Sequence, residues 1–311
     1  MTINADHQQA LEELDFRLRT VLPEEYQECY EDVQPVSMGS AGLKYAPDGS
    51  VAWDEIWDTF CDLAMAGGPP HKGTLLEPAT PAEIDARPDR YREVVEEIGR
   101  GATMVTDLPS DVSPVPGWCR LFCDTEEMAG WLLRAIVMEN VAARSEGRWL
   151  DLPAAPDFRL EKEIKNVITV IAKTCHYWVG HMPSSQEQAI ADLFATLAEE
   201  SPLVVPSLSD GIRREADAIR AADMAERIYR DTGLRSSPPH YHGWLGLECP
   251  SVRAAVWMMR AMVVSNVLAR REGSVLFVPI NAVTDPNGER VAGGLARIHR
   301  LAAAREVLKT S

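Results

Sequence analysis

Residues 67–77 combine side chains that could bind and activate a small molecule. The sequence GGPPHKGTLLE places His71 and Lys72 between glycines and prolines, with Glu77 shortly after. Such a stiff, irregular loop can hold side chains at a site. A His can act as a general base near neutral pH while a Lys neutralises an anionic group. The alternative is a surface turn with a solvated His–Lys pair.

A second group of candidates begins in the sequence PPHYHGW. His240 and His242 are two residues apart, so in an extended segment their side chains project to the same side. Glu248 adds a carboxylate to the apolar stretch that follows. Two histidines and a carboxylate are compatible with zinc or iron, but a third clear ligand is missing. The alternative is a pair of polar loop histidines, and any other cofactor is unknown.

A third cluster is Cys175, His176 and His181 in the sequence TCHYWVGHM. Imidazoles near the C-terminus of a helix are favourable without any chemistry, so a structural role is favoured for this cluster. The chain lacks the G-x-S-x-G, G-x-G-x-x-G, HExxH and phosphate-loop motifs. This weighs against the commonest hydrolases, dinucleotide enzymes and metalloproteases, and no nucleotide motif is present.

Two arginines lie in segments that are apolar nearly all round. Arg134 is within GWLLRAIVM and Arg260 within VWMMRAMVV, patterns typical of a helix packed between layers. A buried guanidinium needs a carboxylate, carbonyl groups or an anionic ligand, because burying an isolated charge is costly. Arg134 and Arg260 therefore either form structural contacts or bind an anionic substrate.

These elements belong to an internal repeat. Residues 117–153 align with 243–279 without a gap at an offset of 126, and 17 of the 37 positions are identical. The matches include tryptophans, an arginine and an asparagine: Trp118/Trp244, Trp131/Trp257, Arg134/Arg260 and Asn140/Asn266. A period this long exceeds that of a solenoid repeat and indicates a duplicated domain.

Each copy reads as a strand, a long helix and a second strand. The helix is expected to end at Gly147 or Gly273 in the left-handed conformation. Strand–helix–strand predicts a parallel pair with a right-handed crossover. A hairpin is expected at Pro47-Asp48-Gly49. Flanking helices are expected at 54–66, 88–99, 160–177, 186–200, 210–230 and 289–308.

We therefore expect an α/β fold, internally duplicated, with two pseudo-twofold-related halves. The halves are residues 1–182, with repeat core 117–153, and residues 183–311, with repeat core 243–279. Each is built on the strand–long helix–strand unit and its flanking helices.

Composition narrows the class of protein. The 311 residues are 46% hydrophobic and 25% charged, as in ordinary globular proteins, and the net charge is −16. Such an acidic chain disfavours nucleic-acid and membrane partners. The N-terminus has no signal-peptide pattern, and the six cysteines are few enough to be reduced thiols. These features predict a cytoplasmic protein of unknown oligomeric state.

The function expected from these residues is that of a metabolic or biosynthetic enzyme acting on a small anionic molecule. One asymmetric site near the interface of the halves would use His71, Lys72, His240, His242 and Glu248 in acid/base or metal-assisted chemistry. The alternative is a non-catalytic small-molecule-binding or assembly subunit. A ligand consumed on incubation would favour the enzyme.

Overall fold

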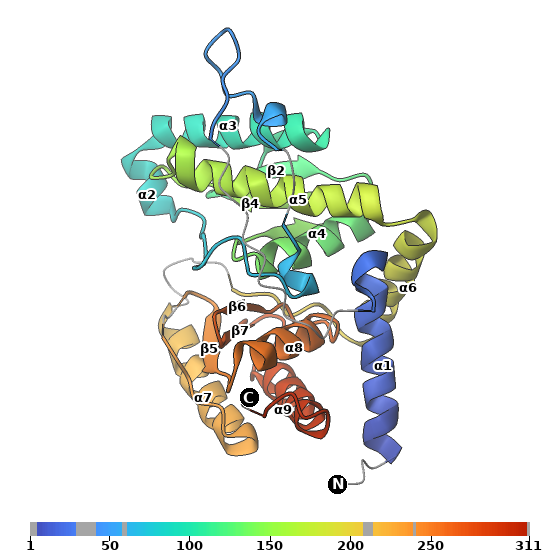
Figure 1. Ribbon diagram of the computed structural model, residues 1–311. Helices are drawn as coiled ribbons and strands as arrows, with labels where there is room; N and C mark the ends of the chain where they lie inside the picture. The colour runs from blue at the N-terminus through green and yellow to red at the C-terminus, as the bar shows by residue number, and fades with distance from the viewer. Residues whose placement is uncertain (1–4, 29–41, 58–60, 208–213, 239–240, 310–311) are drawn as a thin grey trace. The chain divides into compact units, whose positions relative to one another are not determined.

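The computed structural model describes residues 5–28, 42–57, 61–207, 214–238 and 241–309 (Figure 1). It is a mixed α/β structure with two small antiparallel sheets. Within the described residues the helices are α1 (Ala5–Val21), α2 (Pro81–Ala86), α3 (Pro88–Thr106), α4 (Glu126–Met138), α5 (Lys165–His181), α6 (Ser184–Glu200), α7 (Arg214–Thr232), α8 (Val252–Val263) and α9 (Glu289–Ala304). The strands are β1 (Ser110–Val112), β2 (Trp118–Phe122), β3 (Arg144–Glu146), β4 (Trp149–Pro153), β5 (Trp244–Glu248), β6 (Arg270–Glu272) and β7 (Val275–Pro279).

The chain divides into two compact units. One consists of residues 34–183, and the other of residues 184–311 together with 1–33. We call them the 34–183 unit and the 184–311 unit. The assignment of 1–182 and 183–311 as domains stays a prediction.

The sheet of the 34–183 unit has the strand order β1-β2-β4-β3. The predicted parallel pair is wrong, because β2 and β4 run antiparallel with Trp118 opposite Pro153 and Phe122 opposite Trp149. The reason is the short strand β3, which forms a hairpin with β4. Its two-residue turn contains Gly147, whose φ of +55° suits a residue without a Cβ. The turn reverses the chain, so β4 runs against β2.

The sheet of the 184–311 unit has the order β5-β7-β6 and the same registers. Trp244 pairs with Pro279 and Glu248 with Val275, again antiparallel. The parallel pairing predicted here is therefore also wrong. Gly273, with φ of +57°, occupies the turn between β6 and β7.

The two central helices end earlier than predicted. α4 ends at Met138 and α8 at Val263, not at Gly147 and Gly273. The left-handed residues after them are Asn140 and Asn266, with φ of 61° and 60°. Asn tolerates this conformation better than most residues, because its short polar side chain can hydrogen-bond locally.

Both central helices are packed on nearly all sides, as their sequences predict. α4 packs on α5 and on β3 and β4, while α8 packs on α9 and on β6 and β7. Arg134 and Arg260 are 5% and 3% exposed. Further helix pairs among the described residues include α3 on α5, α7 on α9 and α1 on α6.

The predicted helix at 54–66 is not formed by the residues described there. They make two single 3₁₀ turns, Trp53–Glu55 and Ala64–Ala66. The expected hairpin before them is present, with Tyr45 bridged to Val51 in antiparallel fashion.

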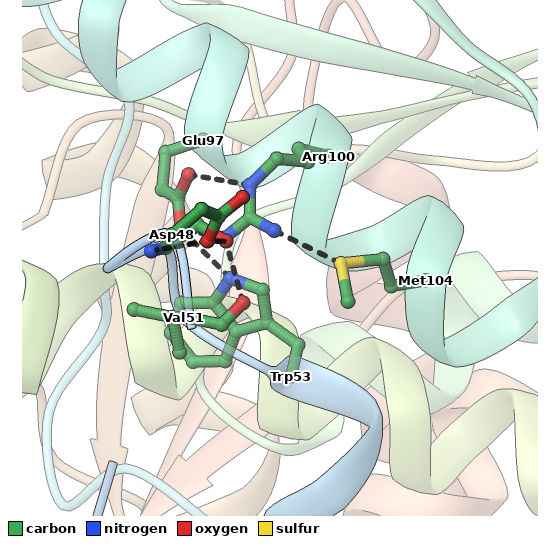
Figure 2. A network of polar contacts seen from close by, with 7 residues as sticks. Asp48, Val51, Trp53, Glu97, Arg100 and Met104 are labelled. Carbon is green, nitrogen blue, oxygen red and sulfur yellow. Dashed lines mark hydrogen bonds and ion pairs between the residues drawn. The ribbon is translucent and has the colours of Figure 1, made fainter. Parts of the chain in front are cut away.

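A polar network fastens this hairpin to α3 (Figure 2). Trp53 donates its indole N–H to Glu97 at 2.8 Å. Arg100 pairs with Glu97 and donates to the carbonyl oxygen of Val51 at 2.9 Å. These contacts fix the start of the segment that leads to the loop at 67–77.

The other predicted helices are present with shifted ends. α3 extends past the predicted 88–99, and a π-turn at Leu160–Ile164 precedes α5. α6 and α9 lie at 186–200 and 289–308 to within a few residues. The predicted 210–230 corresponds to α7, although residues 208–213 lie outside the described part of the chain. No helix among the described residues combines the length and apolarity needed to cross a membrane.

Candidate functional site

A fully buried ion pair lies beneath the loop at 67–77. Lys173 in α5 and Glu139, the residue after α4, both have side chains that are 0% exposed, and Lys173 Nζ is 2.7 Å from Glu139 Oε1. Removing a charge from water is costly, so a buried pair persists only where further hydrogen bonds complete it. Glu139 and Lys173 were not identified from the sequence.

The Glu139 carboxylate receives those further hydrogen bonds from the backbone of the loop and of the 3₁₀ turn that precedes it. Oε1 accepts from the Ala64 amide at 2.9 Å, and Oε2 accepts from the His71 amide at 2.7 Å. The Glu139 carbonyl oxygen accepts from the Lys72 amide at 3.1 Å. One residue thereby determines the backbone positions of both loop residues predicted to do chemistry.

Asn140 forms further hydrogen bonds with the same loop. Its side-chain amide donates to the Lys72 carbonyl oxygen at 2.8 Å. Its own carbonyl oxygen accepts from the Leu76 amide, and Leu76 bridges to Val141 in parallel fashion. The loop is thus built against the end of α4 rather than free in solvent, which argues against the solvated-turn interpretation.

The His71 ring is partly buried beside α5. Its Nε2 lies 3.1 Å from Asn166 Oδ1. Burial, and then the positive charge of Lys173, lower the pKa of His71 against the opposing effect of Glu139. His71 is therefore neutral at physiological pH. With an amide oxygen as its partner, Nε2 carries the proton and Nδ1 is left as the basic nitrogen.

The Lys72 side chain is partly buried near charged residues. Burial lowers the pKa of Lys72, and the charges of Lys162 and Arg159 lower it further, whereas Glu163 raises it. Glu163 is itself paired with Arg159 at 2.9 Å, a contact that lowers the pKa of this carboxyl to about 2. Glu163 has the largest of these charge effects, so charges of both signs act on the Lys72 amine.

Four of the described cysteines have thiols that are poorly suited to act as nucleophiles. Cys61 Sγ accepts from Lys173 Nζ at 3.4 Å and is buried. Burial raises the pKa of the Cys119, Cys123, Cys175 and Cys249 thiols to about 12. These thiols stay protonated at neutral pH, and all five described cysteines are reduced.

Arg134 and Arg260 lie inside the helix layers. Arg134 donates to the Gly130 carbonyl oxygen at 2.9 Å, within its own helix. Burial lowers the pKa of Arg134 to about 10. Substrate binding by either arginine stays a prediction.

The second predicted group belongs to the 184–311 unit. His242 Nε2 is 3.4 Å from Ser207 Oγ, while Glu248 is exposed at the end of β5. His240 lies outside the described residues. The grouping of these residues with His71 and Lys72 in one site stays a prediction. Among the residues that the structure describes, no cluster of three or more His, Cys, Asp or Glu could hold a metal.

Glu139, Asn166 and Lys173 were not identified from the sequence, and only Glu139 differs from its counterpart in the repeat in a way that could have drawn attention to it. At the repeat offset, Glu139 corresponds to Ser265, a charged-to-neutral change next to the shared Asn140/Asn266 pair. Asn166 and Lys173 had no comparable signal, because the repeat ends at 153 and their partners lie far away in sequence.

No protein-family model, curated protein or solved structure matches this chain.

Proposed function

We propose that the 34–183 unit contains a site for a small anionic molecule at which His71 acts as a general base and Lys72 binds the anionic group. The chain would then be an enzyme that removes a proton from its substrate or from water. The observation that carries this proposal is the buried Glu139–Lys173 pair, whose carboxylate accepts a hydrogen bond from the His71 amide.

The state of His71 supports the assignment of a base. A general base must be unprotonated at the working pH and within reach of the proton that it takes. Burial and the Lys173 charge keep His71 neutral, and Asn166 orients the ring. Glu139 and Lys173 act as positioning residues, since the Glu139 carboxylate accepts from the His71 amide and Lys173 pairs with that carboxylate.

The charge around Lys72 supports an anionic ligand. Lys162 and Arg159 lie close enough to Lys72 to lower its pKa, although burial lowers it more and the carboxylate of Glu163 raises it. An anion bound to Lys72 would be stabilised by its charge. Because His71 is the neighbouring residue in the chain, the anion would bind to the same loop as the proposed base. Lys72, Lys162 and Arg159 would supply the positive charge for such an anion in a chain whose net charge is −16.

The test is a thermal-shift screen against small carboxylates and phosphates, followed by incubation with each ligand that stabilises the protein. We expect such a ligand to stabilise the wild type and His71→Gln but not Lys72→Met, and to be consumed only by the wild type. The matched control is Lys309→Met, an exposed lysine in the other unit. A ligand that stabilises Lys72→Met as much as the wild type would contradict the proposal.

The alternative function is a non-catalytic small-molecule-binding protein. It is favoured by the loop's dense hydrogen bonding, which would serve a rigid binding site equally well. Recovery of the bound ligand unchanged would identify this function.

We further propose that residues 117–153 and 243–279 descend from one duplicated unit. The strands of the two segments begin and end at positions 126 residues apart, and the bridges Leu76–Val141 and Val204–Val267 occupy matching places. The twofold relation between the halves stays part of this proposal. An experimental structure in which the two segments superpose with the same side-chain directions would support it, and a different path in either segment would contradict it.

A further inference from the structure

Two histidines, one exposed and one partly exposed, meet at the C-terminal end of α5. His176 Nε2 and His181 Nε2 are 3.1 Å apart, and the ring centroids are separated by 4.9 Å. Five residues along a regular helix correspond to about 140° of rotation, so the sequence spacing alone predicts divergent side chains. They converge here because His181 is the last residue of the helix.

The surroundings of the pair hold the two rings in place. Both rings pack against Tyr177, with centroid distances of 5.7 Å to His176 and 5.0 Å to His181. Residue 180, one turn after His176, is a glycine, and a Cβ there would lie 3.8 Å from the His176 ring. No side chain from that position competes for the space beside the imidazoles.

The nitrogen separation matches that of two ligands on one metal ion. Imidazole nitrogens bind Zn²⁺ and similar ions at about 2.0–2.1 Å, so two nitrogens 3.1 Å apart subtend about 98° at the metal. This angle lies between the octahedral and tetrahedral values. A metal would replace the hydrogen bond between the two nitrogens, with each ring then keeping its proton on Nδ1.

We infer that His176 and His181 form a surface site for one divalent transition-metal ion. Imidazole ligands suit copper, nickel and zinc, and among these Cu²⁺ binds most tightly at a given nitrogen site. No third His, Cys, Asp or Glu among the described residues completes a cluster, so water fills the remaining positions. The site is independent of the His71 loop and of the proposed function.

The test is calorimetric titration of the full chain with Cu²⁺ and with Ni²⁺, comparing the wild type with His176→Ala, His181→Ala and the double variant. The matched control is His7→Ala, because His7 is also a partly exposed histidine on a surface helix. Circular dichroism checks that each variant is folded, which is expected because both histidines lie at the surface.

We expect one metal ion per chain in the wild type and in His7→Ala. Either single substitution should weaken binding by about tenfold or more, since even the loss of an outer-shell partner costs this much. The double variant should bind no more tightly than the weaker single variant. Equal binding by the wild type and the double variant would overturn the inference, as would a loss in only one single variant or a loss in His7→Ala.

Discussion

Residues 117–153 and 243–279 share a backbone pattern but bury different side chains. In the first segment Asp151 accepts two hydrogen bonds from Arg120, at 2.7 and 2.9 Å, and lies 3.4 Å from Arg144. In the second, Phe277 and Gly246 stand at the positions of Asp151 and Arg120.

The arginine at the position of Arg144 and Arg270 therefore has different partners in the two segments. Arg270, the counterpart of Arg144, is 0% exposed and lies over the rings of Phe277, Tyr241 and Trp244 at 4.0, 4.4 and 5.1 Å. It also pairs with Glu272 at 2.7 Å. One backbone thus accommodates a carboxylate-centred cluster or an aromatic one.

The same contrast occurs at the helix ends. Asn140 and Asn266 both donate to carbonyl oxygens of the preceding loop, those of Lys72 and Ser201. Only the first segment adds a carboxylate, Glu139, where the second has Ser265. The contact that both segments keep supports the fold, whereas the one found in a single segment is where a function can reside.

The largest expected effect comes from breaking the buried ion pair. Lys173→Met should reduce the free energy of unfolding by about 5 kcal/mol, because Glu139 is left charged and buried. Ser265→Ala, the matched change in the second segment, should alter it by less than about 0.5 kcal/mol. Chemical denaturation measures both. Equal losses of unfolding free energy in the two variants would mean that the buried ion pair at the end of α4 contributes no more to stability than Ser265 does at the end of α8.

A smaller loss is expected at the carboxylate-centred cluster. Asp151→Asn should reduce the free energy of unfolding by about 3 kcal/mol. The reason is that Arg120 and Arg144 both lose the negative charge with which they pair. Arg270→Met should cost about 1–2 kcal/mol, the scale of a desolvated cation–π contact. The comparison again uses urea denaturation, and a larger loss for Arg270→Met would reverse our ranking of the two clusters.

The shared asparagines should respond alike. Asn140→Ala and Asn266→Ala should each cost about 2 kcal/mol, because Ala is strained at a φ near 60° and a hydrogen bond is lost. The matched Asn→Gly variants relieve the strain and should cost about 1 kcal/mol. A difference of more than about 1 kcal/mol between the two positions would show that the two asparagines have different roles.

The smallest effect is a pH dependence at His71. Its folded-state pKa is lowered, so the unfolded chain takes up a proton near pH 6.5 before the folded chain does. The stabilisation is fully present above pH 6.5 and is lost as the pH falls below it. Between pH 7.5 and 5.5 the wild type should therefore lose up to about 1.4 kcal/mol more than His71→Gln.

The pH measurement has an internal control. Burial also lowers the pKa of His299, which is present in both proteins and cancels in the difference. Glu163 titrates far below this window, at about 2. Parallel stability curves for wild type and His71→Gln would show that His71 is not perturbed by its surroundings.

The sequence by itself determined the strand–helix–strand order of β2, α4 and β4 and of β5, α8 and β7, and the apolar character of both helices. Periodicity and burial are local properties, so WLLRAIVM predicts a helix packed on all sides wherever it lies. The stiff loop containing His71 and Lys72 was predicted in the same way, from glycines and prolines close in sequence.

Only the tertiary structure decided the strand directions and the partners of the buried charges. The three-residue strand β3 is too short for a sequence pattern, yet its hairpin makes β4 antiparallel to β2. Glu139 lies 68 residues from His71 and 34 from Lys173, and neither distance leaves a signal in one sequence. Charge partners are selected by the geometry of the folded core, because Coulomb energies depend on distance in space and not along the chain.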